Sequence, residues 1–112
     1  MIIHRRTIFG LMAAPAILSS AQAQDFPTQA LRLIPPYPPG GGTDTVARLL
    51  LPHLISQLGQ NIVVENRGGA GGTIGSRIVA GADPDGTTLM FTSASHAINP
   101  TLYKSLPYDT LK

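Results

Sequence analysis

A glycine-rich turn joins a short apolar segment to an amphipathic helix pattern. The turn, Pro38-Pro39-Gly40-Gly41-Gly42-Thr43-Asp44, follows the apolar segment 31–34 and precedes a helical repeat that begins at Asp44. A turn of this kind exposes backbone N–H groups at the positive end of a helix dipole, where they can hold an anion without a charged side chain. The sequence therefore favours a chain that binds a small acidic molecule.

Three strand-like segments alternate with two helix-like segments along the chain. The hydrophobic patterns predict strands over 31–34, 61–65 and 87–92, and helices over 44–58 and 74–82. This β-α-β-α-β order predicts an α/β fold with a parallel sheet and flanking helices.

The first helix carries its own end signals. Thr43 or Asp44 is the expected N-cap, and Gly59 is a suitable residue just beyond the C-terminus. Pro52 falls inside the helix, where it is expected to kink or loosen the backbone.

Polar or glycine-rich loops follow all three predicted strands. They cover 35–43, 66–73 and 93–100, and a helical turn is expected over 101–106. The carboxyl ends of parallel strands lie at one edge of the sheet, which is where such sheets bind ligands. We therefore expect the three loops to meet at that edge.

The first 23 residues match a secretory signal peptide. Arg5 and Arg6 precede an apolar stretch of 14 residues, 7–20, and Ala21-Gln22-Ala23 fits the small-x-small cleavage pattern. The stretch is shorter than the about 20 residues that a membrane-spanning helix needs. We expect export to the periplasm, with the general secretory route favoured over the twin-arginine route, and Gln24 as the first mature residue.

The composition excludes several classes of function. The chain has eight basic and six acidic residues, and loss of Arg5 and Arg6 leaves six of each. A neutral mature chain offers no basic face for nucleic acid and no lysine run for a membrane surface. The absence of cysteine excludes a disulfide framework and a thiolate metal site. The histidines, His4, His53 and His96, have no metal-ligand spacing, so no metal or cofactor is expected, and the chain is expected to be a monomer.

The glycine-rich loops do not fit the common nucleotide motifs. No Lys-Ser or Lys-Thr pair follows Gly42, as a phosphate loop of a nucleotide hydrolase requires. The second loop, with Gly69, Gly71 and Gly72, lacks both the glycine spacing and the downstream acid of a dinucleotide site.

A hydrolytic site in the third loop is a competing interpretation. Ser95 and His96 are adjacent, neighbours on an extended backbone point apart, and no Gly-x-Ser-x-Gly elbow is present. An exported α/β hydrolase-like enzyme fragment that uses Ser95 or His96 nevertheless stays open as an alternative. A truncated product without activity is another.

Ordered segments with characteristic spacing run along the chain. They are Leu31-Arg32-Leu33-Ile34, Tyr37-Pro38-Pro39-Gly40-Gly41-Gly42-Thr43-Asp44, Ala47-Arg48-Leu49-Leu50, Leu58-Gly59-Gln60, Val63-Val64-Glu65-Asn66-Arg67, Gly69-Ala70-Gly71-Gly72-Thr73-Ile74-Gly75, Pro84-Asp85-Gly86, His96-Ala97-Ile98-Asn99-Pro100, Leu102-Tyr103-Lys104 and Leu106-Pro107-Tyr108-Asp109. In this order they resemble the N-terminal part of the periplasmic substrate-binding proteins of tripartite tricarboxylate transporters, also called the Bug family.

The resemblance implies a periplasmic-binding-protein-like clamshell of two domains. Residues 24–112 would form the N-terminal part of domain one, in a longer protein that is not an enzyme. The implied ligand is a small carboxylate (a tricarboxylate, a dicarboxylate or an amino acid), and the implied partners are membrane transporter subunits. In such receptors backbone groups and ordered waters hold most of the ligand carboxylate, in agreement with the helix N-terminus argument.

The resemblance also implies a set of ligand-binding residues. Carried over position by position, they are Tyr37, Gly41, Gly42, Thr43 and Asp44 on the first loop, Asn66 on the second, and Ser93, Ser95 and His96 on the third. One position departs from the family pattern, because Pro35 stands where an apolar strand residue such as valine is usual. Pro35 is expected to shorten the first strand, since proline cannot donate to a β-ladder.

A clamshell with one wall cannot close on its ligand. We therefore predict that the 112-residue chain alone binds a dicarboxylate very weakly or not at all. Calorimetry with citrate, glutamate and similar acids measures this, and tight binding would contradict the prediction.

Overall fold

Three short parallel strands form the sheet in residues 25–111, the part of the chain that the computed structural model describes. The strands are β1 (Leu31–Ile34), β2 (Ile62–Val64) and β3 (Thr88–Met90). Their order is β2-β1-β3, so that Leu33 of β1 lies opposite Val64 on one side and Leu89 on the other. The predicted α/β fold with a parallel sheet is confirmed.

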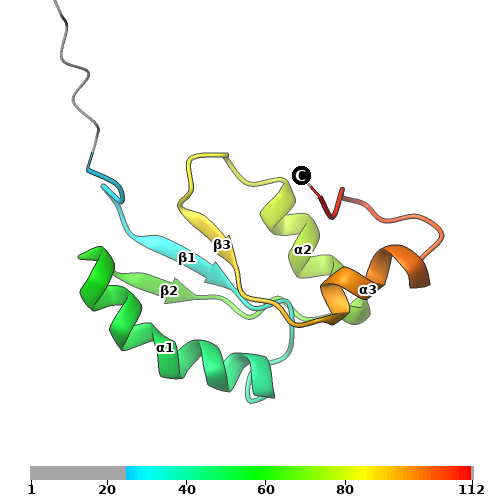
Figure 1. Cartoon of the computed structure of the whole chain (residues 1–112), viewed down its shortest axis with the longest axis horizontal. Helices are drawn as coiled ribbons and strands as arrows, with labels where there is room; N and C mark the ends of the chain where they lie inside the picture. Colours follow the sequence, from blue (N-terminus) through cyan, green and yellow to red (C-terminus); the bar gives the residue numbers. More distant parts are fainter. Residues whose placement is uncertain (1–24, 112) are drawn as a thin grey trace, which may run out of the picture.

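The helices cover both faces of this sheet. They are α1 (Gly42–Leu58), the short 3₁₀ turn η1 (Ala70–Gly72), α2 (Thr73–Ala80) and α3 (Ser95–Leu102). Figure 1 shows α1 on one face, α2 on the other, and α3 beyond the end of β3. The last segment, 103–111, folds back toward α2. The described residues contain no helix of the length and apolarity that crossing a membrane requires.

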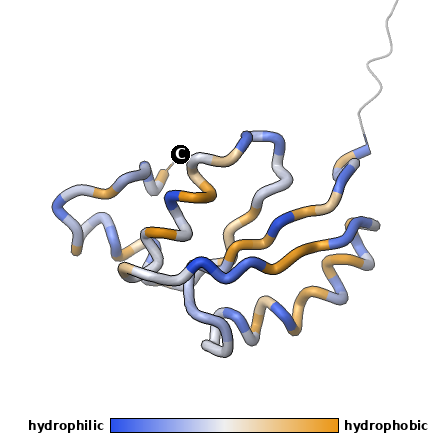
Figure 2. The backbone as a smooth tube through the Cα atoms, turned by 180° about the vertical axis from the view of Figure 1, so that it is seen from behind, coloured by the Kyte–Doolittle hydropathy of each residue, from blue (hydrophilic) through white to orange (hydrophobic). Residues whose placement is uncertain are grey.

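The core lies between α1 and the sheet. Side chains alternate between the two faces of a strand, so Leu31, Leu33 and Ile62 all point toward α1, where they bury Ala47 among them. Figure 2 shows the apolar residues along the strands and at helical spacing on α1. Partly buried side chains complete the cluster: Leu51, Leu54, Ile55, Leu58, Val64 and Phe91.

The ends of α1 differ in how well the sequence predicts them. The helix begins at Gly42 with Gly41 as N-cap, so the expectation of Thr43 or Asp44 as the cap is wrong. Asp44 lies in the first turn, where its carboxylate bonds back to the N–H of Gly40. The C-terminus is as expected, because Gly59 has φ 66° and its N–H bonds to the carbonyl of Ile55. The helix runs unbroken through Pro52.

The expected polar loop over 93–100 and helical turn over 101–106 are wrong. Helix α3 starts at Ser95 and continues through Pro100 to Leu102. Two tertiary hydrogen bonds hold it, from Asn99 Nδ2 to the carbonyl of Gly71 (3.1 Å) and from Tyr103 Oη to the carbonyl of Ala70 (3.1 Å). These contacts with η1 offset the backbone hydrogen bond that a proline removes from a helix.

Pro35 ends β1, as its sequence position predicts. The strand stops at Ile34, but the carbonyl of Pro35 still accepts a hydrogen bond from the N–H of Arg67 at 3.0 Å. The chain after β1 and the chain after β2 therefore stay side by side beyond the sheet. The predicted signal peptide, residues 1–23, lies outside the described residues.

Helix α2 packs against this pair of segments through a glycine. A Cβ atom on Gly75 would lie 2.6 Å from Cβ of Pro36 and 2.7 Å from the carbonyl oxygen of Arg67, and neither atom belongs to a flexible side chain. Only a residue without a side chain allows α2 to approach so closely.

We predict that Gly75→Ala lowers the free energy of unfolding by about 1–3 kcal/mol, because the added methyl group overpacks a rigid contact. The matched control is Gly81→Ala, where φ is −93° and the new Cβ would meet the carbonyl oxygens of Arg77 at 3.4 Å and Ile78 at 3.9 Å, both ordinary contacts. Urea unfolding of both variants checks this. Equal midpoints for the two variants would contradict the prediction.

Candidate functional site

The three strands end at one edge of the sheet, and a helix begins just beyond each of them. The connecting loops are 35–41 between β1 and α1, 65–72 between β2 and α2, and 91–94 between β3 and α3. Helix N-termini carry a partial positive charge and N–H groups without intrahelical acceptors. Three such termini at one sheet edge favour a negatively charged ligand there.

Tyr37 connects the first and third loops. Its hydroxyl lies 2.8 Å from Oγ of Ser93 and 3.2 Å from Oγ1 of Thr92, and it also bonds to Oγ of Ser95. Ser93 and Ser95 contact each other at 3.2 Å. These four residues form the hydroxyl cluster, in which the predicted site residues Tyr37, Ser93 and Ser95 come together.

Thr92 belongs to the hydroxyl cluster but was not among the predicted site residues. The sequence interpretation assigned Thr92 to the strand 87–92, whereas β3 ends at Met90 and Thr92 lies on the loop. A hydroxyl two residues beyond the strand is the signal that could have found it. The cluster is open on one side, since Ser93 is exposed.

The hydroxyl cluster changes the acidity of Tyr37. Burial raises the pKa of the phenol, but hydrogen bonds to Ser93, Ser95 and Thr92 together outweigh burial and leave the pKa below its ordinary value. A phenol hydroxyl can donate a hydrogen bond to an anion.

Asp44 is a buried carboxylate whose partners all belong to the protein. It accepts hydrogen bonds from the N–H of Gly40 (2.9 Å), from Nε of Arg48 (3.1 Å) and from Nδ2 of Asn66 (3.0 Å). These bonds, with that of Gly40 the largest contributor, lower the pKa of Asp44 to about 2. The network therefore stabilises the turn 40–44 and occupies the carboxylate of this predicted ligand residue.

Asn66 ties the second loop to the first. Its Nδ2 donates to the carbonyl of Tyr37 (3.3 Å) as well as to Asp44, and its Oδ1 accepts from Nη2 of Arg48 at 3.2 Å. Both ends of the amide are thus engaged within the protein. Asn66 orients the turn that carries Tyr37 and Asp44.

The predicted residues Gly41, Gly42 and Thr43 form the start of α1. Gly41 and Gly42 are exposed, and the carbonyl of Gly41 accepts hydrogen bonds from the backbone N–H and the hydroxyl of Thr45. The N–H groups of the first turn have no carbonyl four residues earlier within the helix. They are the backbone donors that the sequence predicted for an anion.

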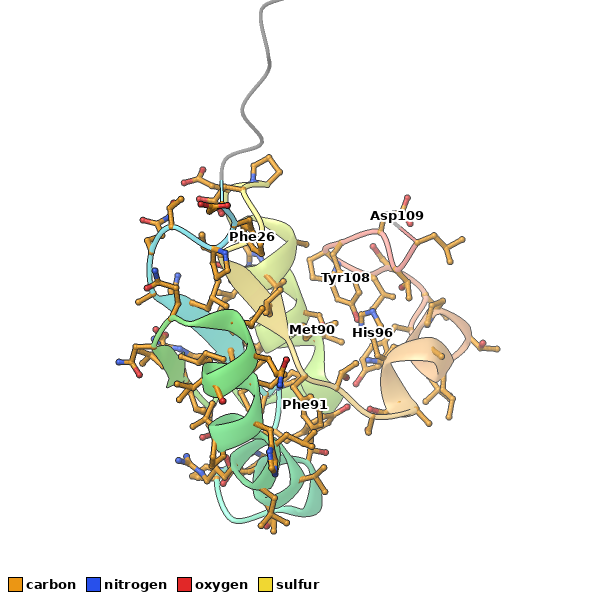
Figure 3. All side chains as sticks on the ribbon, turned by 60° about the vertical axis from the view of Figure 1, so that its left-hand side comes forward. Phe26, Met90, Phe91, His96, Tyr108 and Asp109 are labelled. Carbon is orange, nitrogen blue, oxygen red and sulfur yellow. The ribbon has the colours of Figure 1, made fainter. Side chains whose placement is uncertain are left out.

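The contacts of His96 are with residues outside the hydroxyl cluster. Its Nδ1 is 3.2 Å from Oγ of Ser76, and its ring stacks on Tyr108 with the centroids 5.6 Å apart and the planes 8° apart. Figure 3 shows the His96 and Tyr108 rings beside each other. Adjacent residues in the first turn of α3 thus point to different partners, Ser95 to Tyr37 and His96 to Ser76.

The arrangement does not resemble a hydrolytic triad. Ser95 bonds to Tyr37 and Ser93 and not to His96. The serine that is hydrogen-bonded to His96 is Ser76, which is only 3% exposed and donates to the carbonyl of Gly72. A buried serine cannot attack a substrate. Within residues 25–111 no group of three or more His, Cys, Asp or Glu side chains is placed to hold a metal ion.

Comparison with known proteins identifies the family. The family described as the tripartite tricarboxylate transporter family receptor, TctC, matches residues 46–112. The chain belongs to this family. Among curated relatives, BugT of Bordetella pertussis is 41% identical over 108 residues, which are 94% of this chain and 33% of BugT.

Solved structures of relatives share the fold. The periplasmic binding protein BugD is 42% identical with a TM-score of 0.73 and matches 76% of this chain and 28% of its own. MatC of Rhodopseudomonas palustris, solved with bound malate, is 40% identical with a TM-score of 0.70, covering 78% of this chain and 30% of MatC. The chain spans about a third of the length of the curated TctC relatives that it matches.

We predict that stability falls in acid because of Asp44. Its pKa of about 2 in the folded chain lies below the ordinary 3.8, so folding favours the ionised form. The contribution to stability is complete above the ordinary value and is lost as the pH falls through about 2. Urea unfolding between neutral pH and about pH 2 should show this loss, and Asp44→Asn should flatten it.

Glu65 needs a separate control in that experiment. Its pKa is also lowered to about 2, first by the hydrogen bond from Arg32 and then by that from Arg67, so it titrates over the same range. Glu65→Gln should leave the Asp44 part of the acid dependence in place. An Asp44 carboxyl resonance that titrates at the ordinary value would contradict the prediction.

Proposed function

We propose that this chain forms one wall of the ligand site of a periplasmic solute-binding receptor, which captures a small carboxylate for a tripartite tricarboxylate-type transporter. Residues 1–23 would be the export signal and 24–112 the N-terminal part of the first of two domains. The ligand would be a tricarboxylate, dicarboxylate or amino acid, and membrane transporter subunits would be the partners. No catalytic step is part of the proposal.

The convergence of donors around Tyr37 carries the proposal. Tyr37 is linked to the start of all three helices. Its hydroxyl bonds to Ser95 of α3, Asn66 donates both to its carbonyl and to Asp44 of α1, and a Cβ on Gly72, the N-cap of α2, would be 3.4 Å from its ring. Hydroxyls and helix N-termini at one place suit a carboxylate.

The cations near the site are already paired. Arg48 is bonded to Asp44 and Asn66, and Arg67 is bonded to Glu65. A ligand at the hydroxyl cluster would therefore meet neutral donors, with the charge of Asp44 balanced by Arg48. Malate, which is bound in the MatC structure, is a small carboxylate of the kind that such neutral donors would hold.

The proposed ligand residues divide into two roles. Tyr37, Gly41, Gly42, Thr43, Ser93 and Ser95 would offer donors directly to the carboxylate, and Thr92 joins them through the hydroxyl cluster. Asp44 and Asn66 would shape the first loop, because their polar groups are engaged within the protein.

We predict that Tyr37→Phe weakens malate binding by about fivefold, the effect of one lost hydrogen bond of about 1 kcal/mol. The rest of the ligand site can be supplied by a chimera, in which this chain replaces the matching 30% of MatC. Calorimetry with malate on the chimera and its Tyr37→Phe variant measures the effect.

Tyr108→Phe is the matched control, because it also removes one phenol hydroxyl and keeps the ring, but this hydroxyl has no hydrogen-bond partner among the described residues. A folded chimera that does not bind malate, or one in which Tyr37→Phe binds as tightly as the parent, would count against the proposed function.

A further inference from the structure

Ser76 joins three elements through one hydroxyl. It lies on α2, is 3% exposed, and places Oγ 2.9 Å from the carbonyl oxygen of Gly72, 3.4 Å from Sδ of Met90 and 3.2 Å from Nδ1 of His96. The hydroxyl thus contacts the N-cap of α2, the end of β3 and the first turn of α3.

The distances assign the hydrogen atoms of this contact. A serine hydroxyl has one hydrogen, and the short 2.9 Å approach to the carbonyl of Gly72 is that of a donated O–H bond. The carbonyl can only accept, whereas Oγ can also accept through its lone pairs. The 3.2 Å contact is then an N–H···O bond that His96 donates from Nδ1.

The His96 ring is fixed on a second side by stacking. The ring of Tyr108 lies nearly parallel to it, with 8° between the planes (Figure 3). An imidazole held by both a directional hydrogen bond and a stacked ring has little freedom to turn. Its backbone is consequently fixed as well, at the second residue of α3.

Ser95 precedes His96 in the same turn of α3. Successive helical residues project about 100° apart, so a fixed His96 sets the direction in which Ser95 projects. Ser95 bonds to the hydroxyl of Tyr37 and to Ser93, within the hydroxyl cluster.

We propose that His96 is a positioning residue for the carboxylate site: with a proton on Nδ1 it donates to Ser76, and this bond holds Ser95 against Tyr37. His96 therefore acts through Ser95 and not by touching the ligand. The inference rests on the proposed function for its effect on binding, but its structural part stands on the contacts of His96 itself.

Nuclear magnetic resonance of the chain tests both parts. The ¹⁵N shifts of the imidazole report which nitrogen carries a proton in the unaltered chain, and the expected result is a proton on Nδ1. The ring resonances of Tyr37 report the hydroxyl cluster at a distance from the substituted residue. Titration with malate of the chimera, in which this chain replaces the matching 30% of MatC, then reports binding.

Three variants separate the hydrogen bond from the ring. His96→Phe keeps an aromatic ring for Tyr108 but removes the donor, and it should shift the Tyr37 resonances and weaken malate binding by about threefold to fivefold. His96→Asn places an amide N–H where Nδ1 stood, and it should restore the Tyr37 resonances. His53→Phe, at an exposed histidine of α1, is the matched control and should leave Tyr37 unchanged.

The outcomes are decisive in either direction. A proton on Nε2 with Nδ1 bare would overturn the inference, as would a His96→Phe chain whose Tyr37 resonances match those of the control. If the tautomer and the Tyr37 shifts are as expected while the folded MatC chimera does not bind malate, the positioning by His96 holds and the proposed function fails.

Discussion

The carboxylate of Asp44 is the interaction on which the first loop depends. It is buried at the start of α1, where it meets a backbone N–H from Gly40, the guanidinium of Arg48 and the amide of Asn66. A buried charge with three donors is stable only while all three are present. Arg48 lies one helical turn beyond Asp44, and Asn66 lies on the loop after β2, so one side chain fixes the turn, the helix and the neighbouring loop together.

This network also determines what kind of anion site the edge of the sheet offers. The protein's own carboxylate already uses one N–H at the start of α1, and Arg48 balances its charge. What faces outward is the exposed first turn of α1 and the hydroxyls around Tyr37. Binding to such neutral donors depends on geometry and desolvation more than on long-range attraction, and so it responds only weakly to salt.

The sequence predicts the strands, the first two helices and the edge where the loops meet, because these follow from local patterns. Alternating apolar residues and glycine-rich turns can be recognised from a few consecutive residues. The third helix was missed because Pro100 argues locally against it, whereas the contacts that hold it, Asn99 with Gly71 and Tyr103 with Ala70, join residues far apart in the sequence.

The candidate site follows the same division between local and distant contacts. The resemblance to the Bug family selected Tyr37, Ser93 and Ser95 as site residues, and the structure brings these three together. Sequence could not tell that His96 bonds to Ser76, because their pairing depends on how α2 lies against α3. The role of a residue that bonds to another side chain of the protein can be assigned only once the packing of the helices is known.

The three loops behave as one unit because each is tied to the next by a side chain. Asn66 joins the second loop to the first, Tyr37 joins the first to the third, and Asn99 of α3 returns to the second loop at Gly71. The ties form a closed ring, so movement of any one loop strains the other two. A change in η1 would therefore reach Ser95 through α3. The positions of the hydroxyl groups around Tyr37 thus depend on Asn66, Asn99 and Gly71, which tie the loops together.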